Sequence, residues 1–143
     1  MAKLVKRITI QAPVEQVFAY ISEPDNQVEI WPSIVEVSDV RRTPDGGYTH
    51  GWVYKMAGIR LTGSTRTLEF VPNQRFVEET RGGLESVLTW TFEPEGAGCK
   101  LTVVTEYKVP IPVLGRMAEA IIVKMNDHEG DMVLANLKAR MEA

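Results

Sequence analysis

Residues 114–141 read LGRMAEAIIVKMNDHEGDMVLANLKARM and contain no proline. Apolar side chains recur in this stretch at helical spacing and cluster on one side at about 100° per residue. The members of this stripe are Leu114, Met117, Ala118, Ile121, Met125, Met132 and Ala139. A helix of roughly 28 residues is about 42 Å long at about 1.5 Å per residue. Such a helix needs a wide apolar surface to lie on.

An antiparallel sheet upstream of the helix offers that surface. Between residues 34 and 109 the apolar period is two, and turns rich in Gly, Pro, Asn and Asp separate the runs. Strands are expected at 3–11, 34–42, 47–56, 59–71, 75–80, 84–93 and 99–109. The pattern predicts an α+β domain in which a curved antiparallel sheet of about seven strands wraps around the last helix.

Two short helices are expected between the first and the second strand. Pro13 stands where a helix would start, and apolar residues of 14–21 follow at the i, i+3, i+4, i+7 spacing of one helical face. Pro24 ends this helix and opens a second one, which closes before Trp31.

Length, composition and charge narrow the class of protein. The 143 residues, 44% hydrophobic and 24% charged, predict one globular domain over 1–143. The net charge of -3 disfavours a nucleic-acid partner. No apolar run approaches the roughly 18 residues that span a bilayer, and no signal-peptide pattern follows Lys3, so a cytoplasmic location is expected. The single cysteine, Cys99, excludes an internal disulfide.

The hairpin around residues 57–58 assigns the two faces of the sheet. If these two residues form the loop, antiparallel pairing places alternate residues of both strands on one face. The pairs expected on that face are Met56–Ile59, Tyr54–Leu61, Trp52–Gly63 and His50–Thr65. The opposite face carries charged and threonine side chains, as a solvated sheet surface does. The aromatic face is therefore the interior.

The interior-facing residues of these and later strands mix large aromatic side chains with small and hydroxyl-bearing ones. This mixture predicts an apolar pocket with a few hydrogen-bonding groups between the sheet and the last helix. The expected ligand-binding residues are Trp52, Tyr54, Thr65, Ser86, Trp90, Thr105, Tyr107, Met117, Ile121 and Met125. The alternative is that each hydroxyl is only satisfied at the margin of the sheet.

Ionisable side chains that face such a pocket are candidates for acid and base chemistry. The candidate catalytic residues are His50, Glu78, His128 and Glu129. Hairpin pairing points His50 inward, and both His128 and Glu129 flank the apolar stripe of the last helix. A proton-transfer or metal pair of His50 and His128 with Glu129 stays open as an alternative. Because ligand-spaced His or Cys clusters are missing, neither a metal nor another cofactor is expected.

Two adjacent carboxylates, Glu78 and Glu79, must point to opposite faces of their strand. The apolar neighbour Phe76 favours Glu78 as the inward one. A buried carboxylate with a raised pKa is a plausible general base. The alternative is a carboxylate at the rim that is paired with an arginine.

Three stretches carry a resemblance to a known family: ITIQAPVEQVFAYI at 8–21, WTFEPEGAG at 90–98 and YKVPIPVLG at 107–115. In them the chain resembles the polyketide cyclase/dehydrase and lipid-transport superfamily, also called SRPBCC or START-like. The resemblance covers essentially the whole chain and implies the helix-grip fold with a ligand cavity. It implies no particular catalytic residue.

The family resemblance implies two classes of function. Members bind lipids, hormones, quinones or polyketides, and some cyclise or dehydrate them, so a small hydrophobic ligand is the expected partner here. Other members act as chaperone activators or assembly factors, which makes a non-catalytic accessory protein the alternative. Trp31-Pro32 and the prolines of 110–112 are the apolar elements that such a surface would use, or that would plug the mouth of the cavity.

Overall fold

The structure is a computed structural model that describes residues 2–56, 58–108 and 116–143, with the side chains of 56 and 116–119 outside the description. The elements in chain order are β1 (Ala2–Ile10), α1 (Val14–Ile21), η1 (Pro24–Asn26), α2 (Gln27–Ile30), β2 (Ile34–Arg42), β3 (Tyr48–Met56), β4 (Ile59–Val71), β5 (Arg75–Gly82), β6 (Glu85–Glu95), β7 (Gly98–Lys108) and α4 (Arg116–Met141). The predicted strands and short helices agree closely with these elements.

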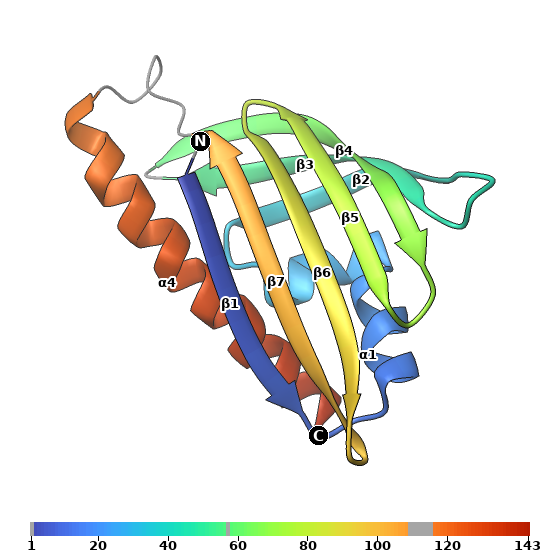
Figure 1. Ribbon diagram of the computed structural model, residues 1–143. Coiled ribbons are helices and arrows are strands. Elements are labelled where there is room, and N and C mark those ends of the chain that lie inside the picture. The colour runs from blue at the N-terminus through green and yellow to red at the C-terminus, as the bar shows by residue number, and fades with distance from the viewer. Residues whose placement is uncertain (1, 57, 109–115) are drawn as a thin grey trace.

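The seven strands form one antiparallel sheet in the order β1-β7-β6-β5-β4-β3-β2. Figure 1 shows the sheet strongly curved, with β2, β3 and β4 turned across the direction of β1, β7 and β6. The helix α4 runs along the β1 edge and packs against β1 and α2. The α+β helix-grip architecture expected from the sequence is confirmed.

Irregular pairing accompanies this curvature. Register shifts fall between Ile34 and Glu36, between Ser38 and Arg41, and between Thr67 and Glu69. An extra residue on one strand of an antiparallel pair bends that strand and increases its twist. The shifts lie in the β2–β3 and β4–β5 pairs, in the half of the sheet that curls over the helices, and they help to bend it.

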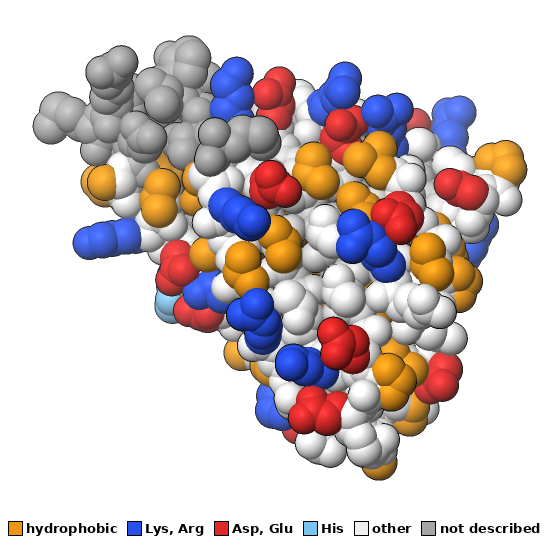
Figure 2. All heavy atoms as spheres, in the orientation of Figure 1, with side chains coloured by type: hydrophobic (Ala, Val, Ile, Leu, Met, Phe, Trp, Pro, Cys, Tyr) orange, Lys and Arg blue, Asp and Glu red, His pale blue; other side chains and the backbone are white. Residues whose placement is uncertain are grey.

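The register of the β3–β4 hairpin confirms the predicted faces of the sheet. The observed pairs include Met56↔Ile59, Tyr54↔Leu61, Trp52↔Gly63 and His50↔Thr65. On the outer face the strands β4 and β5 carry ion pairs such as Arg66–Glu79 and Arg75–Glu69. Figure 2 shows this outer face, where basic and acidic side chains are interspersed. The inner face of the hairpin holds the aromatic residues.

Two apolar clusters make up the core. The larger one joins α1, the inner faces of β5, β6 and β7, and the last turns of α4; its fully buried members include Val17, Phe76, Trp90, Leu101 and Leu137. The smaller one consists of Trp52, Tyr54, Leu61, Tyr107 and Ile122. Both clusters contribute side chains to one hollow on the concave side of the sheet.

The prediction of which residues of α4 (Arg116–Met141) face the sheet is wrong. Ile121, Met125 and Met132 are 59%, 39% and 37% exposed, and Ala139 is exposed too. The buried residues are Ile122, Glu129, Val133, Leu134 and Leu137, whose face lies roughly a third of a turn away at about 100° per residue. The stripe members Leu114, Met117 and Ala118 fall outside the described side chains.

The physical reason is that part of the buried face of α4 borders the hollow and carries polar or small residues. Asn126, Glu129 and Gly130 line that hollow. They interrupt the row of apolar residues on the buried face, so the helix is only weakly amphipathic. No helix in the described part of the chain is long and apolar enough to cross a bilayer.

Candidate functional site

The hollow between the sheet and α4 has two adjoining lobes. The sheet lobe, of about 80 Å³, is lined by Gln27, Ile34, Trp52, Thr65, Glu78 and Thr80. The helix lobe, of about 100 Å³, is lined by Leu4, Glu85, Thr105, Tyr107, Asn126, Glu129 and Gly130. Both lobes share Trp31, Tyr54, Leu84, Ser86 and Leu88. A mostly apolar wall with a few polar groups is typical of small-molecule sites.

The structure brings most of the predicted ligand-binding residues to this wall: Trp52, Tyr54, Thr65, Ser86, Thr105 and Tyr107. Trp90 lies behind the wall, in the larger core cluster. Ile121 and Met125 face solvent, because the helix is rotated from its predicted orientation. The side chain of Met117 lies outside the described residues.

Sequence reasoning missed several lining residues. Thr80 lies two residues after Glu78 on one strand, so strand alternation carried a signal for it. Asn126 and Gly130 were missed because the inward face of α4 was predicted incorrectly. Gln27 comes from the short helix α2, and no sequence pattern indicates that its side chain faces a pocket. Trp31, considered as an exposed element or a plug, lines both lobes.

Glu78 is the buried carboxylate of the sheet lobe. Its side chain is 7% exposed, as predicted for the inward member of the pair. The Trp90 Nε1 group donates a hydrogen bond to Oε2 at 3.3 Å, and Gln27 Nε2 donates one to Oε1 at 3.3 Å. Glu79 points outward and pairs with Arg66 and Arg81.

Burial decides the protonation of Glu78. Removal from water raises its pKa from 4.5 to about 7, although the hydrogen bonds from Trp90 and Gln27 act in the opposite direction. None of the ion pairs among the described residues involves Glu78. This carboxyl group therefore exchanges its proton near neutral pH, as a general acid or base must.

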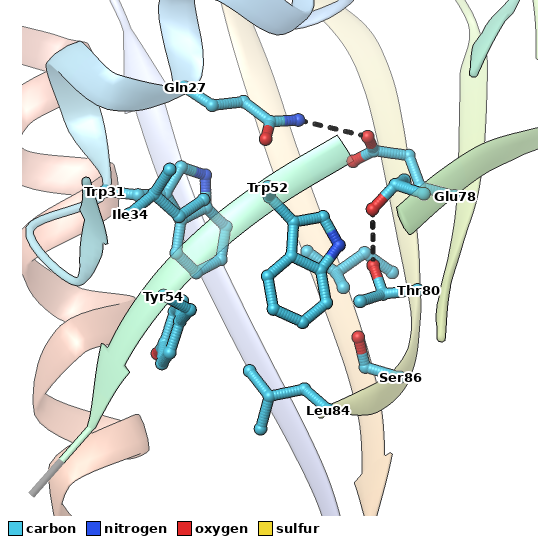
Figure 3. A pocket seen from close by; sticks show the side chains of 11 residues that line it. Gln27, Trp31, Ile34, Trp52, Tyr54, Glu78, Thr80, Leu84 and Ser86 are labelled. Atoms are coloured by element: carbon cyan, nitrogen blue, oxygen red, sulfur yellow. Dashed lines mark hydrogen bonds between the residues drawn. The ribbon is translucent and has the colours of Figure 1, made fainter. Parts of the chain in front are cut away.

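Other polar groups of the sheet lobe gather near Glu78. The hydroxyls of Thr65 and Thr80 hydrogen-bond to each other at 2.9 Å across the strands β4 and β5. The indole nitrogen of Trp52 is buried and has no hydrogen-bond partner among the residues that the structure describes. Figure 3 shows this nitrogen on the side of the indole ring that faces Glu78 and Thr80. The lobe thus has a polar end at Glu78.

Glu129 ties α4 to the rest of the wall. Its Oε2 accepts hydrogen bonds from the Tyr54 hydroxyl at 2.7 Å and from Ser33 Oγ at 2.6 Å. Its Oε1 accepts one from the Ser33 backbone N–H at 3.1 Å. Burial and the nearby Glu129 charge raise the pKa of Tyr54, so the phenol stays protonated and donates. Glu129 holds α4 against β3 and the turn after α2, and its catalytic role stays a prediction.

Replacing Tyr54 with phenylalanine is expected to lower the free energy of unfolding by about 2 kcal/mol. The substitution removes a buried hydrogen bond to a carboxylate, and such bonds contribute about 1.5–3 kcal/mol. Urea denaturation measures the change. Tyr20→Phe is the matched control, because the Tyr20 hydroxyl donates to Glu29 at 2.8 Å at an exposed site. Equal losses in both variants would contradict the anchoring role of Tyr54.

The two histidines do not meet in the cavity. His128 is exposed on α4, so its predicted place in the pocket is wrong and the pair with His50 and Glu129 is not formed. His50 is buried on the inner face, where desolvation lowers its pKa and Nε2 has no hydrogen-bond partner in the described ranges of the chain. It is not part of the wall of either lobe. Among the described residues, no group of three acidic, His or Cys side chains is placed to hold a metal ion.

Solved structures share this fold at low sequence identity. The protein TTHA0849 from Thermus thermophilus has a TM-score of 0.85 and 20% identity over 98% of this chain and 97% of that chain. A START superfamily protein from Mycobacterium smegmatis has a TM-score of 0.73 and 16% identity over 98% and 97% of the two chains. The di-domain ARO/CYC StfQ from the steffimycin biosynthetic pathway has a TM-score of 0.78 and 17% identity, with 98% of this chain covering 50% of StfQ.

The sequence itself assigns the family. No curated protein matches the chain. The family model described as polyketide cyclase/dehydrase and lipid transport matches residues 1–142. That match spans the sheet, the short helices and α4, which together form the wall of the hollow. The chain therefore belongs to the polyketide cyclase/dehydrase and lipid transport family.

Proposed function

We propose that the protein binds a small hydrophobic molecule in the two-lobed hollow and that Glu78 exchanges a proton with it. The observation that carries the proposal is the buried carboxyl group of Glu78, which has no cationic partner among the described residues and faces a mostly apolar wall. A group of this kind is costly to bury. Perturbed carboxyl groups in clefts are common in functional sites.

The ligand class follows from the wall and from the family. A lipid-, quinone- or polyketide-like molecule presents the apolar surface that Leu84, Leu88 and Tyr107 would cover. The family description and the ARO/CYC neighbour support a cyclase or dehydratase reaction. In such a reaction the Glu78 carboxylate would remove a proton from a carbon beside a carbonyl group, and the carboxylic acid would return that proton to a departing hydroxyl as water leaves.

Filling the hollow is expected to weaken ligand binding at least about tenfold. Ser86 lines both lobes, so Ser86→Phe places a ring in the space that the ligand needs. The uncharged dye N-phenylnaphthylamine should bind the wild type in one saturable step. The variant should bind about tenfold more weakly or worse, since overpacking a site of this size costs at least about 1.4 kcal/mol.

Val87→Phe is the matched control for this experiment. Val87 is the next residue of β6, and neighbouring residues of a strand point to opposite faces of the sheet. Its substitution should leave dye affinity unchanged. Thermal melts of both variants separate lost binding from lost folding. The absence of saturable binding to the wild type would contradict the proposed function.

One observation favours the accessory alternative. Ile121, Met125 and Met132 form an exposed apolar stripe along α4, and such stripes mark contact surfaces in other proteins. Of the other apolar elements considered, Pro32 is exposed, whereas residues 110–112 lie outside the described part. An accessory role would leave dye binding dispensable, so Ser86→Phe would retain activity and a Met125→Lys variant would lose it.

A further inference from the structure

The indole N–H of Trp52 is a buried donor that finds no acceptor in the described part of the chain. Trp52 is 5% exposed and lines the sheet lobe, and its Nε1 has no hydrogen-bond partner within residues 2–56, 58–108 and 116–143. A buried donor left unpaired costs roughly 1–3 kcal/mol, and most buried polar groups in folded proteins are paired. A ligand oxygen in the lobe would remove this cost. The other orphaned nitrogen, on His50, does not border the hollow.

The position of Trp52 is built into the sheet. Gly63 is its cross-strand partner, and a Cβ atom at that position would come within 2.4 Å of the indole Cζ2. The ring therefore occupies the space that a side chain at position 63 would fill. The ring of Tyr54 packs edge-on against it, with centroids 6.5 Å apart. These contacts restrict the rotamer of the Trp52 side chain, so its N–H stays directed toward the end of the lobe that holds Glu78 and Thr80 (Figure 3).

The neighbouring polar groups make the donor available to a ligand. The hydroxyls of Thr65 and Thr80 share one hydrogen bond, in which one donates to the other, and among the described residues neither accepts from the Trp52 N–H. Glu78 already accepts hydrogen bonds from Trp90 and Gln27. The structure thus leaves the Trp52 N–H to an incoming acceptor, while a protonated Glu78 would be a second donor in the same lobe.

The charges around the hollow act against anionic ligands. The charged residues among the described lining are Glu78, Glu85 and Glu129, and no lysine or arginine is among them. A carboxylate or phosphate on the ligand would have to lose its hydration without gaining a counter-charge, which is strongly unfavourable. A neutral oxygen does not carry this penalty.

We infer that the hollow selects uncharged ligands that place a carbonyl oxygen against the indole N–H of Trp52, and that it rejects fatty acids and other carboxylates. The inference rests on the proposed function and deepens it, because it names the chemical class of the ligand and the residue that recognises this class. Trp52 is a specificity-determining residue in this scheme, distinct from the proton-exchanging Glu78.

Three naphthalene probes test the inference by calorimetry: methyl naphthyl ketone, isopropylnaphthalene and naphthoate. Trp52→Phe keeps an aromatic ring but removes the N–H donor together with part of the ring area, and the hydrocarbon probe measures the effect of the lost area separately. This variant should bind the ketone roughly three- to tenfold more weakly than the wild type does, as expected for one hydrogen bond. Its affinity for the hydrocarbon should change by less than about twofold. Naphthoate should bind the wild type at least about tenfold more weakly than the ketone.

Trp31→Phe is the matched control. Trp31 lines the sheet lobe as Trp52 does, and it lines the helix lobe too. Its indole nitrogen is not among the buried unpartnered atoms of the described chain. Its substitution should shift the ketone and hydrocarbon affinities in parallel. The inference is overturned if Trp52→Phe affects both neutral probes alike or neither, or if naphthoate binds as tightly as the ketone.

A measurement on the unaltered protein covers the case in which Trp52→Phe does not fold. The chain has three tryptophans, so its two-dimensional NMR spectrum should contain three indole N–H signals, with that of Trp31 assigned by Trp31→Phe. The ketone should move one of the other two downfield, and isopropylnaphthalene should not. Binding of the hydrocarbon without a ketone-specific shift would defeat this inference alone. Failure of every probe to bind would defeat the proposed function itself.

Discussion

Replacing Glu78 with glutamine is expected to stabilise the protein by about 3 kcal/mol at pH 8. The pKa of Glu78 is about 7 in the folded protein, because burial raises it, and 4.5 when the residue is exposed. Between these values the folded chain holds a proton that the unfolded chain has released. Stability therefore falls as the pH rises through this window, and the deficit is complete above about pH 7.

Glutamine should remove this deficit because it is uncharged at every pH and has nearly the shape of glutamate. Its carbonyl oxygen can accept from Trp90 Nε1, and its NH₂ group can donate to Gln27 once that amide is turned. The difference in unfolding free energy between variant and wild type should be small near pH 4 and grow toward pH 8. Urea denaturation over this range measures it.

Glu79→Gln is the matched control on the neighbouring position. Glu79 points outward and pairs with Arg66 and Arg81, so its replacement should slightly lower the free energy of unfolding above pH 5 instead of raising it. Equal stability of the wild type and Glu78→Gln at pH 8 would contradict the raised pKa. With a substrate in hand, Glu78→Gln should also lower turnover by roughly 10²- to 10⁴-fold, since a general acid or base contributes about that much.

Gly63→Ala is expected to destabilise the protein by at least about 2 kcal/mol and to abolish ligand binding. A Cβ atom on Gly63 would lie 2.2 Å from the Arg81 carbonyl oxygen and 2.4 Å from Trp52 Cζ2. The first contact is with the backbone of β5, so the strand itself must move. The second forces the Trp52 ring out of its place in the wall.

Gly51→Ala tests whether the effect is specific to this position. Gly51 lies on β3, and the nearest atom to an added Cβ there is Ser38 Oγ at 3.0 Å. That hydroxyl ends a flexible side chain that can rotate, so the stability should change by less than about 1 kcal/mol. Urea denaturation and N-phenylnaphthylamine titration are run on both variants. Similar results for both glycines would show that the Gly63–Trp52 contact does not position the wall.

The strands and their faces were predictable because a strand alternates with a period of two. Trp52, Tyr54 and Thr65 were assigned to the interior from one hairpin, and the observed register agrees. The same rule placed one of Glu78 and Glu79 inside, and the neighbour Phe76 favoured Glu78 without settling the choice. Of the polar end of the sheet lobe, Thr65 and Glu78 were therefore among the residues predicted from the sequence, whereas Thr80 and Gln27 were not.

The orientation of α4 was not predictable in this way. Its exposed side carries Ile121, Met125 and Met132, whereas its buried side includes Glu129. The polar residue is tolerated inside because Tyr54 and Ser33 donate to it. These partners lie 75 and 96 residues away in the sequence, so no local periodicity reveals them.

Side-chain alternation and turn residues act over a few positions, so the sequence was enough to predict the α+β fold and the aromatic lining, and it favoured Glu78 over Glu79 as the inward carboxylate. Three properties could be seen only in the packed structure: which face of α4 closes the hollow, that the pKa of Glu78 rises to about 7, and that the N–H of Trp52 has no partner among the described residues. Those properties depend on water being excluded by residues from α2, β3 and β6 together, and exclusion of water is set by packing between segments that are distant in the chain.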